Sequence, residues 1–140
     1  MKQAGAALIL VMGLFQVAYG LGGYQMAYQV GYGAITLMAV MISLTFLWLW
    51  QVRATPLALG MSFSWAGSAC VMGWWWMFNL LDQPVWAADH WLLLQFLSLY
   101  VVGAALHFSV IQASFGGQGP WFLLPVGLAL GISALIHGAF

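Results

Sequence analysis

Three histidines are the side chains of this sequence best suited to chemistry in apolar surroundings. His90, His107 and His137 can each offer a ring nitrogen to a metal or exchange a proton near neutral pH. Polar groups are costly to bury in a membrane, so their presence there indicates function or a specific packing role. The chain contains no glutamate, which excludes the Glu-based acid and metal motifs of helical bundles.

His107 lies in the segment GAALHFSVI, inside a predicted helix. Gly103, four residues earlier, would leave room beside the imidazole for a flat ring. His107 is therefore a candidate ligand for a haem iron or for the magnesium of a chlorophyll or bacteriochlorophyll. The alternatives are a hydrogen bond from the imidazole to a neighbouring helix, or a place on a proton or substrate path.

His90 and His137 are expected at the same membrane face, because one begins a predicted helix and the other ends the next. His107 lies 17 residues after His90, which places it about 25 Å deeper at 1.5 Å per residue. A bis-histidine haem could use only His90 and His137, near the surface, where it would be poorly buried. Asp82 and Asp89 with His90 are too sparse a set, and we expect no metal site.

The segment MGWWWMFNLLDQP contains three consecutive tryptophans, whose rings should point about 100° apart on a helix. Most of the nine tryptophans fall near predicted helix ends, which is typical of the aromatic belts at membrane interfaces. Trp75 lies deeper. Its ring is a candidate for stacking on a flat cofactor, with helix packing as the alternative.

Long apolar helices must position these residues. The chain of 140 residues is 65% hydrophobic and 3% charged, whereas soluble domains have about 25% charged residues. We predict an all-α integral membrane protein, with residues 1–140 forming one transmembrane helical domain and no soluble domain. Without a basic patch, nucleic acid is excluded as a partner.

Breaks in the apolar pattern predict five spans, with four as the alternative, at approximately residues 4–22, 33–52, 56–81, 89–114 and 120–137. The first span resembles a signal peptide, but we interpret it as a transmembrane helix. Glycines and glutamines over residues 23–32 predict a turn or an interfacial stretch, with absorption into a long tilted helix as the alternative. Thr55 and Pro56 should begin the third helix, and Asp89 should cap the fourth.

Five spans predict an orientation for the chain. With a cytoplasmic N-terminus, Lys2 and Arg53 lie inside and Asp82 and Asp89 lie outside, in agreement with the positive-inside rule. The C-terminus is then on the outer side of the membrane, opposite the cytoplasm. We expect the bacterial inner membrane as the location.

The expected function is that of a non-catalytic accessory or structural subunit of a larger membrane complex of the respiratory or photosynthetic type, in contact with a haem or chlorophyll-type pigment. Its partners would be membrane lipids and other transmembrane subunits, or a second copy bound through Gly127 and Gly131. No nucleophile–base pair can be placed within hydrogen-bond reach, so we do not expect an enzyme.

Two alternatives to the accessory subunit stay open. One is a binder of a flat hydrophobic molecule such as a porphyrin, a carotenoid or a quinone, or of a lipid. The other is a small oligomeric channel or transporter, which would have to use a thin set of polar residues: Gln16, Ser43, Thr45, Ser68 and Gln95.

Overall fold

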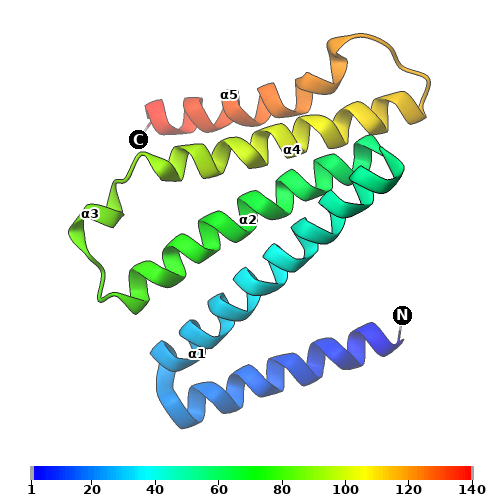
Figure 1. Ribbon diagram of the computed structural model, residues 1–140. Helices are drawn as coiled ribbons and strands as arrows, with labels where there is room; N and C mark the ends of the chain where they lie inside the picture. The colour runs from blue at the N-terminus through cyan, green and yellow to red at the C-terminus, as the bar shows by residue number, and fades with distance from the viewer. Residues whose placement is uncertain (1, 140) are drawn as a thin grey trace.

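The computed structural model describes residues 2–139, and these residues form helices and short connections only. In order, the elements are α1 (Lys2–Arg53), α2 (Pro56–Leu80), α3 (Val85–Ala88), α4 (Leu92–Ser114), the 3-10 helix η1 (Pro120–Leu123) and α5 (Leu124–Ala139) (Figure 1). The predicted all-α fold class is confirmed. The side chain of Lys2, whose charge we expect on the cytoplasmic side, lies outside the described part of the structure.

Three stretches are long and apolar enough to cross a membrane: Gln3–Arg53, Val85–Ser114 and Pro120–Ala139. These stretches fit a membrane location. α2 has 25 residues, but its serines, glycines and tryptophans lower its mean hydropathy. α2 packs against α1 on one side and α4 on the other, so much of its surface meets protein instead of solvent or lipid.

α1 reverses direction at Gly23, and its two halves form an open V (Figure 1). Gly23 has φ 73° and ψ −177°, a conformation that is essentially restricted to glycine because a Cβ would clash there. Residues 24–32 are helical. The structure therefore confines the turn predicted over residues 23–32 to Gly23, and the interfacial location of this stretch stays a prediction.

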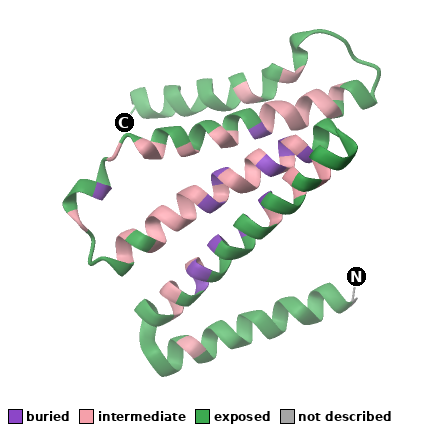
Figure 2. Cartoon of the chain, viewed as in Figure 1, coloured by how far each residue is buried: buried purple, intermediate pink, exposed green. Residues whose placement is uncertain are grey.

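The helices lie in one row, and the largest contacts join α1 to α2 and α2 to α4 (Figure 1). Buried positions lie along the facing sides of the second half of α1, α2 and α4 (Figure 2). The buried apolar residues are all alanines, namely Ala39, Ala58, Ala69 and Ala87. No large side chain among the described residues is fully buried. The core is therefore a thin seam, where small residues let helix backbones approach closely.

The predicted helix starts are correct in one case and wrong in another. Thr55 is the N-cap of α2 and Pro56 lies in its first turn, as predicted. Asp89 does not cap α4, because it ends α3 and α4 begins only at Leu92. His90 takes part in this helix start instead, since its Nδ1 accepts a hydrogen bond from the Leu92 N–H at 3.3 Å.

Candidate functional site

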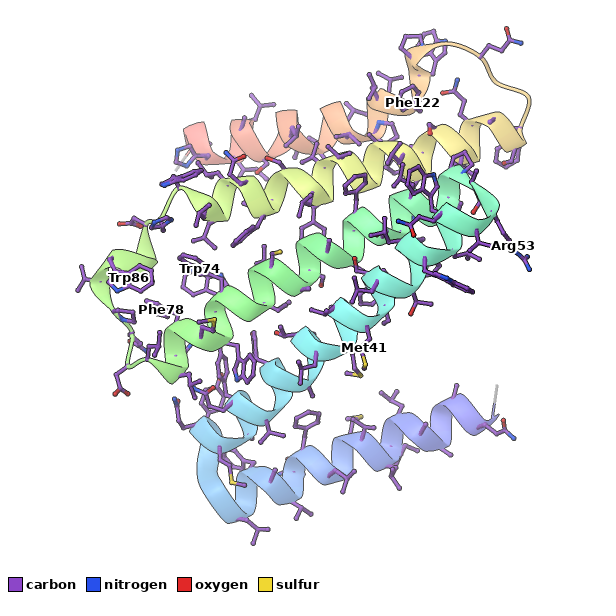
Figure 3. All side chains as sticks on the ribbon, in the orientation of Figure 1. Met41, Arg53, Trp74, Phe78, Trp86 and Phe122 are labelled. Atoms are coloured by element: carbon purple, nitrogen blue, oxygen red, sulfur yellow. The ribbon has the colours of Figure 1, made fainter. Side chains whose placement is uncertain are left out.

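His90 lies in an aromatic cluster at the start of α4. Its ring centre is 5.4 Å from that of Trp74, 6.2 Å from Trp86 and 5.9 Å from Trp91. The indole Nε1 of Trp74 donates a hydrogen bond to the Ala87 carbonyl oxygen at 2.9 Å, which ties α3 to α2 (Figure 3). The cluster therefore fastens the connection between α2 and α4.

The hydrogen bond of His90 determines which ring nitrogen carries the proton. Because Nδ1 accepts from the Leu92 N–H, the neutral imidazole holds its proton on Nε2 and has no free lone pair there. The cavity beside the cluster, bordered by Trp74 and Trp86, has a volume of about 70 Å³. Pockets for small molecules are typically about 300–1,000 Å³, so this one is too small for a flat cofactor.

The three consecutive tryptophans of α2 contact different neighbours. Trp74 packs against Trp86 of α3, and Trp76 lies against α1, where its indole occupies the space that a Cβ on Gly33 would need. Trp75 meets Phe78 edge-on, with ring centres 5.2 Å apart. Two of the rings thus join α2 to its neighbours, and stacking of Trp75 on a cofactor stays a prediction.

His137 lies in the last turn of α5 and is exposed. α5 runs back along α4, so that its last turns approach the end of the molecule where α4 begins (Figure 1). His90 and His137 therefore lie at the same end of the helices, measured along the helix axes. His107 lies in the second half of α4, away from both.

α2 and α4 approach each other closely beside His107. A Cβ on Gly103 would stand 3.1 Å from the Gly60 carbonyl oxygen and would overlap the Ser64 side chain. The backbone of α2 thus fills the space beside Gly103. The room that we expected there for a flat ring does not exist.

Both ring nitrogens of His107 have a close neighbour. Nδ1 lies 2.8 Å from the Gly103 carbonyl oxygen, and Nε2 lies 2.8 Å from the Met61 Sδ. A carbonyl oxygen can only accept, so Nδ1 carries the proton and donates it. The neutral imidazole then turns the lone pair of Nε2 toward the thioether.

This arrangement distinguishes His107 from His90. A metal-ligating histidine almost always donates its second ring N–H to a carbonyl, a carboxylate or a water, which leaves the other nitrogen free to bind. His107 has this arrangement through Gly103, whereas the hydrogen bond of His90 opposes it. Met61 was missed by sequence reasoning, because a methionine in an apolar helix carries no signal of its own.

Two other groups of polar side chains join α1 to α2, whereas most of the remaining ones bond within their own helix. Ser43 Oγ donates to the Ser62 carbonyl oxygen at 2.9 Å, and Ser62 Oγ donates to the Ser43 carbonyl oxygen at 3.1 Å. Asn79 Nδ2 donates to the Tyr28 hydroxyl oxygen at 3.1 Å, which connects the end of α2 to α1. Thr45 instead donates to the Met41 carbonyl oxygen of its own helix.

An open apolar groove of about 700 Å³ runs along η1 and α5. Gly127 and Gly131 lie in its floor, and a Cβ added at either would meet nothing within 4 Å. The predicted association motif is thus turned away from the other described helices. It offers a surface on which a further helix can pack closely.

Comparisons with known proteins add no relative. A scan against protein-family models and searches of curated proteins and of solved structures found no match to the chain. Within residues 2–139, no group of three or more His, Cys, Asp or Glu side chains is placed to hold a metal. The His107–Met61 contact and the open apolar surfaces are therefore the features from which function can be inferred.

Proposed function

We propose that the chain is an integral membrane protein that serves as a non-catalytic accessory subunit of a larger membrane assembly. The extent of its exposed surface carries this proposal. The chain exposes 10146 Å², whereas a compact monomer of 15.3 kDa would expose about 7,100 Å². If partners covered this excess of about 3,000 Å², the interfaces would bury about 6,000 Å² counted over both sides, which is the size of large obligate interfaces.

The excess surface is apolar and lies mainly at the two edges of the row. The first half of α1 is exposed almost throughout, with Leu21 at 82%, and α5 contains no buried residue, with Leu135 at 75% (Figure 2). Water would not tolerate so large an apolar area. Lipid and partner helices would cover it.

The distribution of charge and indole supports a membrane-crossing row of five segments, the first two of which are the halves of α1. Along the helix axes, Arg53 lies at one end of the molecule, and the connections that carry Asp82 and Asp89 lie at the opposite end (Figures 1 and 3). Exposed tryptophans occur near both ends, at Trp48, Trp86, Trp91 and Trp121. This arrangement favours a cytoplasmic N-terminus, since basic residues prefer the cytoplasmic side and indoles the headgroup level.

The polar side chains favour an accessory role over a transporter. Ser43 is buried against Ser62, while Thr45 is exposed and bonded to its own helix. Gln16 and Gln95 are exposed on different helices. These groups do not converge on a common path, and a single row of helices encloses no interior through which a solute could pass.

Pigment or haem contact at His107 stays part of the proposal as a peripheral interaction. Any macrocycle would have to approach from outside the seam between α2 and α4, and Met61 would have to leave Nε2. A complex of the respiratory or photosynthetic type would supply such cofactors.

Native gel electrophoresis tests the accessory role. Membranes that contain the tagged chain are solubilised in a mild detergent, and the bands are identified by mass spectrometry. We expect migration in a larger assembly with other membrane proteins, and migration solely as a free monomer would overturn the proposal. Gly127→Leu and Gly131→Leu should release the chain, because leucine fills the groove. Gly138→Leu, at an open position outside it, should not.

A further inference from the structure

The contact between His107 and Met61 sets two electron-pair donors against each other. Gly103 fixes the proton on Nδ1, so Nε2 presents a lone pair to the Met61 sulfur at 2.8 Å. A thioether sulfur is itself only a weak acceptor and has no proton to share. The pair would be stabilised by a positively charged species placed between the two atoms.

We propose that Met61 and His107 form a binding site for a soft monovalent metal ion, Cu(I), held between Sδ and Nε2. Thioether ligands select Cu(I), and imidazole nitrogen also binds copper. Both ligands are neutral, so the bound site carries a single positive charge. A divalent ion would bring a larger desolvation cost, which an anionic ligand would have to offset.

The sequence around the site offers no such anionic ligand. Cys70 follows Met61 by nine residues on the same helix, a rise of about 13 Å. Asp82 and Asp89 lie farther still, near the opposite ends of α2 and α4. Zinc, which takes four ligands from Cys, His, Asp or Glu, does not fit this pair.

A small movement of Met61 would open the site. With metal–ligand bonds of about 2.0 Å to nitrogen and 2.3 Å to sulfur, as at zinc, the two donors stand roughly 3.5–4.3 Å apart. The sulfur must therefore move by about 1 Å from its position 2.8 Å from Nε2. Methionine has three rotatable bonds and adapts easily. Both residues are half-buried, so an ion can approach without the helices separating.

Anaerobic titration of the purified full chain in detergent with Cu(I), against a chromophoric Cu(I) chelator, tests the site. We expect one tightly bound ion per chain, with copper–sulfur and copper–nitrogen scattering in the X-ray absorption spectrum. Loss of an outer-shell partner alone typically costs about 10–100-fold in metal affinity, so Met61→Leu should weaken binding by at least about 100-fold. Met61→Leu conserves volume and should leave the fold intact.

Matched variants separate this site from nonspecific binding by the eight methionines. Met72→Leu, on the same helix, should bind Cu(I) like the wild type, and His107→Gln should bind as weakly as Met61→Leu. Equal affinity in the wild type and Met61→Leu would overturn the proposal. Absence of Cu(I) binding, together with an NMR spectrum in which both ring nitrogens of His107 are protonated, would also overturn it. A hydrogen bond from Nε2–H to the Met61 sulfur would then account for the short distance. Neither result bears on membership in a larger assembly, which rests on the exposed surfaces at the two edges of the row. A filled Cu(I) site would, however, occupy the Nε2 that the proposed pigment contact at His107 needs.

Discussion

Ser43 and Ser62 connect α1 to α2 at positions more than nine-tenths buried. Each hydroxyl reaches across the seam and donates to the backbone carbonyl oxygen of the opposite residue, so both hydroxyl protons are paired. In an apolar environment such bonds are worth about 0.6 kcal/mol on average and at most about 1.7 kcal/mol. The pair also fixes the register of the two helices.

We expect Ser43→Ala and Ser62→Ala each to lower the free energy of unfolding by about 0.5–1.5 kcal/mol, since each removes one interhelical hydrogen bond. Denaturation of the chain in mixed micelles measures this change. Ser98→Ala is the matched control, because the exposed Ser98 hydroxyl donates only to the Leu94 carbonyl oxygen of its own helix. Ser43→Ala with the stability of Ser98→Ala would contradict a role of the serine pair in packing.

For single residues, the sequence indicates which side chains could bind a metal or form a hydrogen bond. It does not indicate which atoms come into contact. His107 was recognised as a candidate from its residue type and helical position. Its partner Met61 is 46 residues away, and the protonated nitrogen depends on a backbone carbonyl, which every residue has. The same limit applies to the serine pair, because Ser43 and Ser62 differ from the other serines only in what the packing places opposite them.

Among the helices, the first half of the chain shows how composition can mislead. Glycines and glutamines over residues 23–32 are typical of a turn, but Tyr24, Tyr28 and Tyr32 recur at the four-residue spacing that places side chains on one helix face. Their ring centres lie 5.9 and 4.1 Å apart in succession. These tyrosine contacts favour a helix over residues 24–32, so the break in α1 is limited to Gly23.

Gly23→Ala should disturb the reversal of α1. A residue with a Cβ at φ 73° and ψ −177° pays about 1–3 kcal/mol, and a straight helix removes this cost. Spin labels are attached at the exposed positions Leu10 and Leu44, in a chain in which Cys70 is replaced by alanine. Double electron–electron resonance should then give a longer interlabel distance in Gly23→Ala than in the chain that keeps Gly23.

Gly20→Ala is the control for this measurement. Gly20 is helical, and a Cβ there meets nothing within 4 Å, so the interlabel distance should equal that of the wild type. An unchanged distance in Gly23→Ala as well would mean that contacts other than the glycine conformation hold the two halves of α1 together.

For the whole molecule, the sequence predicts the class of protein far better than the arrangement of its helices. Helices that are apolar on every side carry no stripe to mark the face that packs. The buried seam consists of alanine, glycine and serine with one threonine, Thr36. Such small residues also occur on exposed faces, as Gly127 and Gly131 do. The single row could therefore not be predicted, and the five membrane crossings stay a prediction, since three stretches of the described chain are long and apolar enough to span a membrane.

The row makes the orientation of the chain testable. With five crossings, reporters fused to the two termini should lie in opposite compartments, and a reporter in the connection over residues 115–119 should share the compartment of Arg53. Alkaline phosphatase, active only outside the cytoplasm, and a fluorescent protein, active inside, measure this.

Arg53→Glu should yield mixed orientations, because it removes one of only two basic residues. Arg53→Lys keeps the charge and should leave the orientation unchanged. If both termini lie in one compartment, the number of crossings is even, and one terminus lies on the opposite side of the membrane from the one expected.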